Sequence, residues 1–171
     1  MDHLFNTRRQ LIFWITGVAA LLLLIYGWSL TNGFVVWDDA LLVVNNPIAH
    51  GLSWMNIKAA FTTFDPELYI PLTFLSFQIN YALGGLVPFG YHLGNLLLHF
   101  GSVLLVAWSV FGITKNRAAE IITALLFAVH PINVEAVAWV SGRKDVLAGV
   151  FFLLALRTFM KKDESNRFWL W

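Results

Sequence analysis

A run of uncharged, mostly apolar residues extends without interruption from Leu11 to Leu30. As an α-helix it would rise about 1.5 Å per residue, enough to cross the roughly 30 Å hydrocarbon layer of a bilayer. Arg8 and Arg9 precede the run, as in a signal peptide, but the apolar stretch is too long and no small-residue cleavage site follows at Ser29–Gly33. The sequence therefore predicts a retained membrane helix with a cytoplasmic N-terminus.

The composition leads to the same class of protein. Apolar types make up 58% of the 171 residues and charged types only 12%, against about 45–50% and 25% in a soluble domain. The polar side chains are too few to cover a water-facing globule, which excludes a soluble domain or a disordered tail. The net charge of +1 gives no reason to expect a nucleic-acid partner, and the lack of cysteine excludes disulfides and thiolate metal sites.

Three more apolar runs are expected to cross the membrane, at His92–Gly112, Ala119–Trp139 and Val146–Met160. Pro71–Leu83 is apolar but short. If it does not cross, eight Lys and Arg residues lie inside and three outside, whereas a crossing would give four inside and seven outside. The positive-inside rule prefers the first arrangement, which places Pro71–Leu83 along the outer membrane surface.

The predicted fold is an all-α polytopic membrane protein with four spanning helices. The long outer loop, from Thr31 to about Tyr91, carries surface helices at Pro71–Leu83 and after the capping residue Ser53. The charged stretch Lys161–Arg167 leads into Phe168–Trp171, which we interpret as the start of a fifth spanning helix. Residues 1–171 are thus expected to form one incomplete transmembrane domain, a fragment of a longer protein.

Two adjacent carboxylates, Asp38 and Asp39, follow the first predicted helix at its outer end. A carboxylate at the membrane–water boundary can act as a general base toward a hydroxyl. From spacing alone, a solvated acidic pair that ends a helix is the favoured explanation. A divalent cation at this pair is an open alternative, although the sequence contains no metal-ligand spacing that demands one.

Arg143 and Lys144 lie on the outer side, against the positive-inside trend, so some interaction should hold them there. An Arg fork and a Lys point charge both bind phosphate, and ion pairs with Glu135 or Asp145 are the structural alternative.

Histidines add two further candidates, His92 and His130. His92 shares a helical face with Asn95 and His99, which indicates either a polar cavity or hydrogen bonds between helices. For the deeper His99 we favour the hydrogen bond.

Several separated motifs, in this order, resemble a known family. The resemblance covers about Phe34 to Leu156 and rests on Trp37-Asp38-Asp39, Tyr69-Ile70-Pro71-Leu72-Thr73-Phe74-Leu75-Ser76-Phe77, Pro88-Phe89-Gly90-Tyr91-His92-Leu93, Asn95-Leu96-Leu97-Leu98-His99 and His130-Pro131…Glu135…Gly142-Arg143-Lys144-Asp145. These residues look like the N-terminal part of the transmembrane and tetratricopeptide-repeat O-mannosyltransferase-like proteins and their bacterial relatives, which belong to the GT-C class of membrane glycosyltransferases.

The resemblance implies an enzyme that moves a sugar, mannose or a similar hexose, from a polyprenyl-phosphate carrier to an acceptor hydroxyl on a protein or glycan. It implies an inverting displacement on the outer face of the membrane, without a cofactor, with Asp38 and Asp39 as catalytic residues. Phosphate and donor binding would fall to Arg143, Lys144, His92, His130 and Glu135.

Where eukaryotic members tend to have a small residue, this chain has Lys144, so the resemblance implies the bacterial branch, an inner-membrane location and a periplasmic site. Further membrane helices and tetratricopeptide repeats are expected downstream. The alternatives to an enzyme are a non-enzymatic membrane subunit and a component of a lipid-phosphate transporter.

Overall fold

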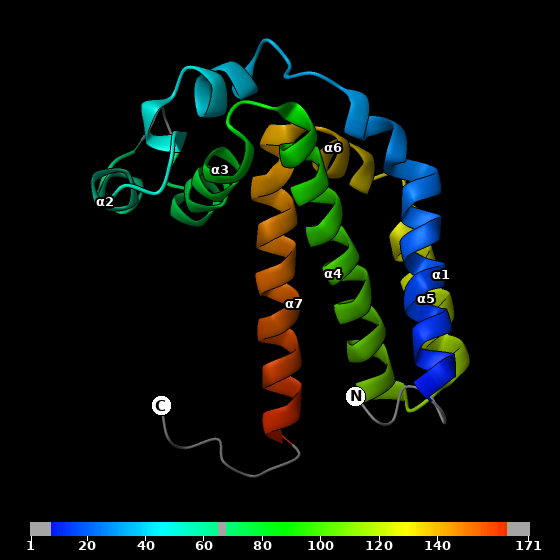
Figure 1. Cartoon of the computed structure of the whole chain (residues 1–171). Helices are drawn as coiled ribbons and strands as arrows, with labels where there is room; N and C mark the ends of the chain where they lie inside the picture. Colours follow the sequence, from blue (N-terminus) through cyan, green and yellow to red (C-terminus); the bar gives the residue numbers. More distant parts are fainter. Residues whose placement is uncertain (1–7, 65–67, 164–171) are drawn as a thin grey trace.

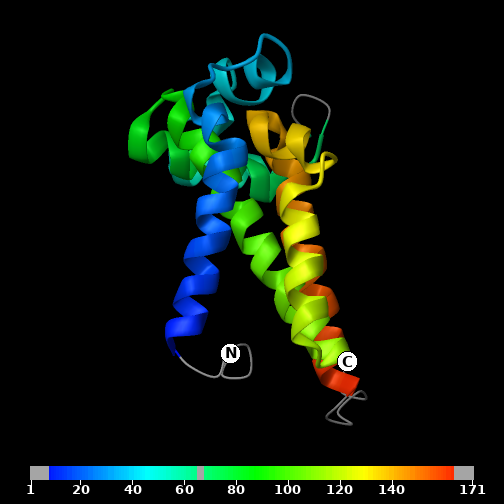
Figure 2. The same ribbon diagram turned by 90° about the vertical axis from the view of Figure 1, so that its right-hand side faces the viewer.

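The computed structural model describes residues 8–64 and 68–163. Four helices run side by side in alternating directions, so that the loops between them gather at two opposite ends (Figure 1; Figure 2). These helices are α1 (Arg8–Tyr26), which continues as a 3₁₀ turn, η1 (Gly27–Thr31), then α4 (Pro88–Thr114), α5 (Arg117–Val129) and α7 (Arg143–Asp163). The predicted fifth helix, Phe168–Trp171, lies outside the described residues.

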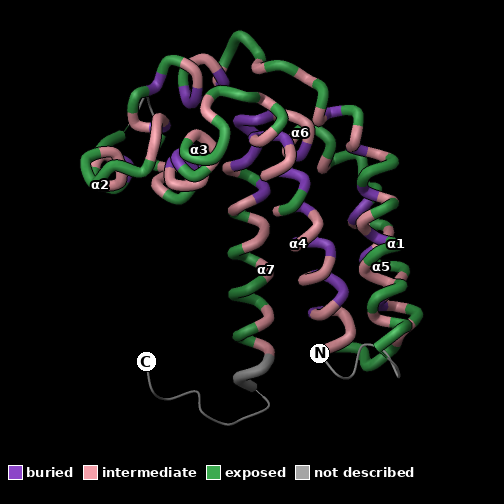
Figure 3. The backbone as a smooth tube through the Cα atoms, viewed as in Figure 1, coloured by how far each residue is buried: buried purple, intermediate pink, exposed green. Residues whose placement is uncertain are grey.

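The central helix is α4, which packs against α1, α5 and α7. Its buried residues run along most of its length (Figure 3). The core around it includes Leu22 of α1, Val103 of α4 and two small residues of α5, Ala124 and Ala128. Small side chains let helix backbones approach closely, which is how helices pack in an apolar solvent.

Two helices are long and apolar enough to cross a membrane, α1 with η1 (Arg8–Thr31) and α4 (Pro88–Thr114). They correspond to the spans predicted at Leu11–Leu30 and His92–Gly112. Helix α7 is also long, at 21 residues, but it begins with Arg-Lys-Asp and ends with Lys-Lys-Asp. Among the described residues, length and composition therefore identify two candidate spans, and the count of four crossings stays a prediction.

The third predicted span, Ala119–Trp139, was wrong as a single helix. Helix α5 stops at Val129 after 13 residues, about 20 Å of rise, and α6 (Asn133–Ala138) follows as a separate short helix. Pro131 explains the break, because its ring lacks an N–H and disfavours helical backbone at the residue before it. That residue, His130, is extended, with φ −66° and ψ 128°.

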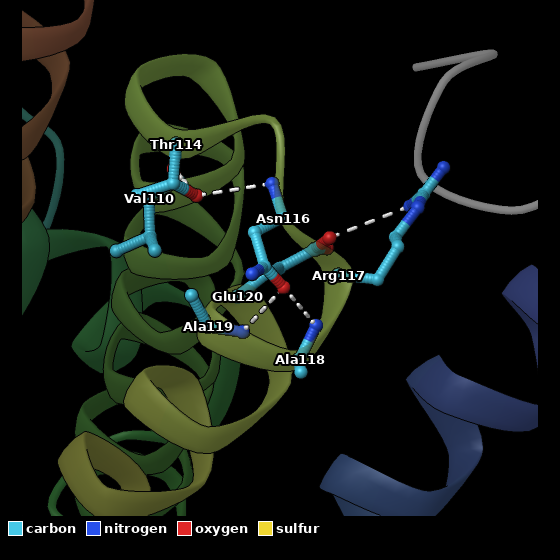
Figure 4. Close-up of polar contacts among 7 residues, drawn as sticks. All are labelled: Val110, Thr114, Asn116, Arg117, Ala118, Ala119 and Glu120. Atoms are coloured by element: carbon cyan, nitrogen blue, oxygen red, sulfur yellow. Dashed lines mark hydrogen bonds and ion pairs between the residues drawn. The ribbon is translucent and has the colours of Figure 1, made fainter.

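The turn between α4 and α5 is tight and held by side chains (Figure 4). Asn116 Oδ1 accepts hydrogen bonds from the backbone N–H groups of Ala118 and Ala119, at 2.8 and 3.2 Å. Arg117 forms an ion pair with the buried Glu120 at 3.4 Å. Asn116 thus caps α5 by satisfying donors that the first turn of a helix leaves free.

The end of the bundle opposite this turn carries α2 (Trp54–Thr62), α3 (Pro71–Gly84) and α6 (Figure 1). The Ser53 cap is confirmed, since its Oγ accepts from the Asn56 N–H at 3.1 Å. Helix α3 begins at Pro71 and stops at Gly85, whose φ of 62° favours glycine. The helical nature of Pro71–Leu83 is therefore also confirmed.

The passage from α6 into α7 runs through a 3₁₀ turn, η4 (Val140–Gly142), and depends on Gly142. A Cβ added at Gly142 would lie 2.8 Å from both the Cα and the carbonyl oxygen of Ala136. Because backbone cannot yield cheaply, we expect Gly142→Ala to destabilise the fold by about 1–3 kcal/mol.

Thermal unfolding of the chain in detergent measures this effect, with Gly149→Ala as the control. A Cβ at Gly149 meets nothing within 4 Å, so this variant should keep the wild-type Tm. Equal Tm values for the two variants would show that α6 and η4 are not closely packed.

Candidate active site

Asp38 and Lys144 are 106 residues apart in sequence and meet at the α3–α6 end of the bundle. The Lys144 Nζ lies 3.5 Å from Asp38 Oδ2, and both side chains are partly exposed. Asp38 precedes a short π-helical turn, η2 (Ala40–Val44), and Lys144 belongs to the first turn of α7. The ion pair therefore joins the loop that follows α1 and η1 to the start of α7.

Asp39 is fully buried, and its carboxylate accepts hydrogen bonds that stabilise the fold. Its Oδ1 accepts hydrogen bonds from the N–H and the Oγ–H of Ser141, at 2.9 and 2.5 Å. Its Oδ2 accepts from the Val35 N–H at 2.9 Å. The neighbouring aspartates thus face different surroundings: Asp39 ties its loop to η4, and Asp38 remains partly open to solvent.

Arg143 is 1% exposed and is held by acceptors from two other helices. Its Nε donates to Asn95 Oδ1 at 2.7 Å, and its Nη2 donates to the Tyr91 carbonyl at 2.5 Å, both on α4. Its Nη1 donates to Asn80 Oδ1 and, at 3.3 Å, to Ser76 Oγ, both on α3. Arg143 therefore fastens α3 and α4 to the start of α7.

The two basic residues predicted to bind phosphate together are placed differently. The Arg143 side chain is buried and donates its hydrogen bonds to other residues of the protein, whereas the Lys144 side chain is partly exposed. The acceptors of Arg143 on α3 and α4 were not predicted from the sequence. The available signal was the polar stripe of Ser76 and Asn80 on α3, one turn apart on a largely apolar helix.

Lys144 also lines a groove of about 280 Å³ between α7 and the start of α3. The other α7 residues that line the groove, Leu147, Ala148 and Phe151, are apolar. On the α3 side, Thr73 carries a hydroxyl group. The lining residues are Tyr69, Ile70, Pro71, Leu72, Thr73, Lys144, Leu147, Ala148 and Phe151. A cation at the head of an apolar groove suits an amphiphile with an anionic headgroup.

The three remaining predicted site residues are not joined to the Asp38–Lys144 pair by any hydrogen bond or ion pair of the described residues. His92 is buried on α4, and neither ring nitrogen has a hydrogen-bond partner there. His130 is exposed, and its Nδ1 accepts from the Ile132 N–H at 3.2 Å. Glu135 is exposed on α6. The hydrogen bond expected for His99 is confirmed, from Nε2 to the Ala128 carbonyl at 3.3 Å.

A metal site has little geometric support. Among residues 8–64 and 68–163, no three His, Asp or Glu side chains converge in a way that could hold an ion. A divalent cation shared by Asp38 and Asp39 would have to compete with the bonds that Asp39 makes to Val35 and Ser141.

Comparison with known proteins gives relatives along nearly the whole chain. Mouse protein O-mannosyl-transferase TMTC1 is 40% identical, over 88% of this chain and 17% of the mouse protein. Human TMTC4, which is also named a protein O-mannosyl-transferase, is 36% identical over 98% of this chain and 26% of the human protein. This chain is therefore TMTC-like. The relationship inferred from the order of the motifs is confirmed.

The TMTC-like chain spans only 17–26% of the length of these relatives. A Drosophila relative, Tmtc1, is 32% identical over 91% of the chain and 19% of its own length. No family model and no solved structure matches the chain. The bacterial branch stays a prediction.

Proposed function

We propose that this TMTC-like chain forms part of a GT-C class glycosyltransferase that takes mannose or a similar hexose from a polyprenyl-phosphate carrier. The acceptor is a hydroxyl of a protein or glycan. The names of the relatives support transfer of mannose. The observation that carries the proposal is the Asp38–Lys144 pair, placed at the head of a groove that is polar at one end and apolar along α7.

Lys144 and the groove would receive the carrier lipid. The ammonium group meets the phosphate, and Leu147 and Phe151, one and two turns further along α7, pack against the first isoprene units. One face of α7 thus matches both the charged phosphate and the apolar chain of the carrier lipid. Lys144 would leave Asp38 for the phosphate as the reaction proceeds, since the polyprenyl phosphate that departs carries more negative charge than the bound donor.

Asp38 would act as the general base. It takes the proton of the acceptor hydroxyl while that oxygen forms a bond to the anomeric carbon from the face opposite the phosphate. The bond from the anomeric carbon to the phosphate oxygen breaks, and the electron pair leaves with the polyprenyl phosphate. The configuration inverts, and Lys144 stabilises the charge that develops on the leaving group.

Asp39 and Arg143 would hold these two groups in place. Asp39 fixes the loop that carries Asp38 through Ser141, and Arg143 fixes the helix start that carries Lys144. Contacts of His92, His130 and Glu135 with the phosphate or sugar stay predictions.

The membrane orientation follows from the predicted charge distribution. The α1 start and the α4–α5 turn lie at one end of the bundle, and α2, α3 and α6 lie at the other (Figure 1). With α1, α4, the α5–α6 unit and α7 as the four crossings, the first end is cytoplasmic under the positive-inside rule. The site then faces the periplasm of a bacterial inner membrane.

Lys144→Gln tests the donor site. We expect this variant, reconstituted in lipid nanodiscs, to bind polyprenyl phosphate about 10- to 100-fold more weakly, because one charge-assisted hydrogen bond contributes roughly 1.5–3 kcal/mol. Equilibrium binding of the radiolabelled lipid measures the change.

Lys58→Gln serves as the matched control. Lys58 is exposed on α2 and does not line the groove, so its loss should leave binding unchanged. If both lysine variants bind like the wild type, the groove does not hold the phosphate.

A further inference from the structure

Trp37 is an indole in an unusual position. Its side chain is 73% exposed, and it directly precedes Asp38 of the candidate site. Its ring centroid lies 6.5 Å from that of Trp139, with an angle of 45° between the ring planes. The Lys144 Nζ lies 5.0 Å from the Trp139 centroid, so Trp139 is close to both Trp37 and the ammonium group. Two indoles, a carboxylate and an ammonium group are therefore gathered at one place.

Anchoring at the membrane interface is the ordinary reason for an exposed tryptophan. Trp54, 77% exposed on α2, fits that reason and makes no ring contact in the described part of the chain. Trp37 differs because its segment is fixed at the site. The hydrogen bonds of Asp39 to Val35 and Ser141 hold the residues on either side of it.

Trp139 adds a second, independent observation. Its indole N–H is buried and has no acceptor among the described residues. Buried donors without acceptors are rare in folded proteins and call for an explanation. Trp139 is placed by the end of α6, whose last turn is bonded to α4 through the Trp139 carbonyl, which accepts from Asn95 Nδ2 at 2.7 Å.

We propose that Trp37 and Trp139 form the wall that receives the sugar ring of the lipid-linked donor. This inference rests on the proposed function and deepens it. The C–H groups of a hexose present an apolar, slightly positive face, which packs on the negative face of an indole. A sugar ring seated on this wall lies next to the Trp139 indole, and the next bond along the donor places its phosphate toward Lys144.

In this arrangement, different residues recognise the lipid phosphate and the sugar of the donor. Lys144 and the groove bind the lipid phosphate with or without its sugar, whereas Trp37 contacts only the sugar. Removal of the Trp37 indole should therefore affect the glycosylated lipid selectively. A membrane-anchoring role would instead affect both lipids, or neither, to the same extent.

The test measures binding of two lipids, polyprenyl phosphate and polyprenyl-phosphate mannose, to the chain in nanodiscs. Trp37→Leu is expected to weaken binding of the mannosylated lipid about 3- to 10-fold and to leave binding of the bare phosphate unchanged. Trp37→Phe, which keeps an aromatic face, should give a smaller loss. Trp54→Leu, the matched control, should change neither.

Each outcome decides between the two proposals. Equal effects of Trp37→Leu on the two lipids, or no effect on either, would overturn the sugar wall while leaving the phosphate groove intact. Failure of the wild-type chain to bind either lipid would overturn the proposed donor site, and the wall with it.

Discussion

Asp38→Asn is expected to lower the rate of sugar transfer by the full-length protein about 10²–10⁴-fold, the usual contribution of a general base. An amide cannot accept the acceptor's proton, yet it has nearly the shape of the carboxylate it replaces. Because Asp38 is partly exposed and its recorded partner is Lys144 at 3.5 Å, its loss should leave the fold in place. We expect kcat to fall and the KM for the lipid-linked sugar to change little.

Transfer from a radiolabelled donor to an acceptor protein in isolated membranes measures this prediction. Asp145→Asn is the matched control, since Asp145 is an exposed carboxylate on the same turn of α7 as Lys144. Asp39→Asn is less informative, because it would disturb the bonds to Ser141 and Val35. Wild-type turnover by Asp38→Asn would remove Asp38 from the mechanism.

Arg143→Met is expected to produce the second large effect, on stability rather than on chemistry. The substitution leaves acceptors on the buried Asn95 and Tyr91, and on the half-buried Asn80, without their donor. Each unsatisfied buried group costs about 1–3 kcal/mol, so a loss of roughly 3 kcal/mol or more is expected. Helix α3 should detach first, because Ser76 and Asn80 lose the side chain that fastens them to α7.

Thermal unfolding in detergent and hydrogen exchange of residues 71–84 measure the two parts of this prediction. Arg143→Lys should rescue only part of the stability, because an ammonium group cannot reproduce a planar fork aimed at several acceptors. Lys144→Gln is the control on the neighbouring residue and should keep the wild-type Tm. An Arg143→Met variant with unchanged Tm and exchange, but weaker phosphate binding, would return Arg143 to the donor site.

Much of the helical framework follows from the sequence. The uncharged runs predicted α1 and α4, Ser53 predicted the start of α2, and Pro71 the start of α3. The break after Val129 was missed because the apolar pattern continues through Pro131 into Ala138. A hydropathy pattern reflects side chains only. It is blind to the missing backbone N–H of a proline, so α5 and α6 were predicted as a single helix.

The sequence predicted one shared role for the members of each neighbouring pair, whereas the structure gives the two members different surroundings. Asp38 and Asp39 are adjacent, as are Arg143 and Lys144, and adjacency suggested that each pair acts together. Consecutive residues of a helix point about 100° apart, so one member of a pair readily faces the interior while the other faces solvent. In each pair the structure buries one member, Asp39 or Arg143.

The partners of the buried members could not be read from the sequence. Asn95 on α4 and Asn80 on α3 indicated that something polar must meet them inside the bundle. Which cation meets them depends on how three helices pack, over separations of 48 and 63 residues. Tertiary packing, not local pattern, decides such contacts.

Side-specific labelling of single cysteines tests most directly whether the Asp38–Lys144 end faces the outside. The chain has no cysteine of its own, so each variant carries one thiol. Val36→Cys, 95% exposed beside the site, and Ile132→Cys, 77% exposed before α6, are expected to react with a membrane-impermeant maleimide in intact spheroplasts. Thr114→Cys, at the opposite end, should react only after the membrane is opened. Protection of Val36→Cys and Ile132→Cys, together with labelling of Thr114→Cys in intact spheroplasts, would place the site in the cytosol and contradict the account.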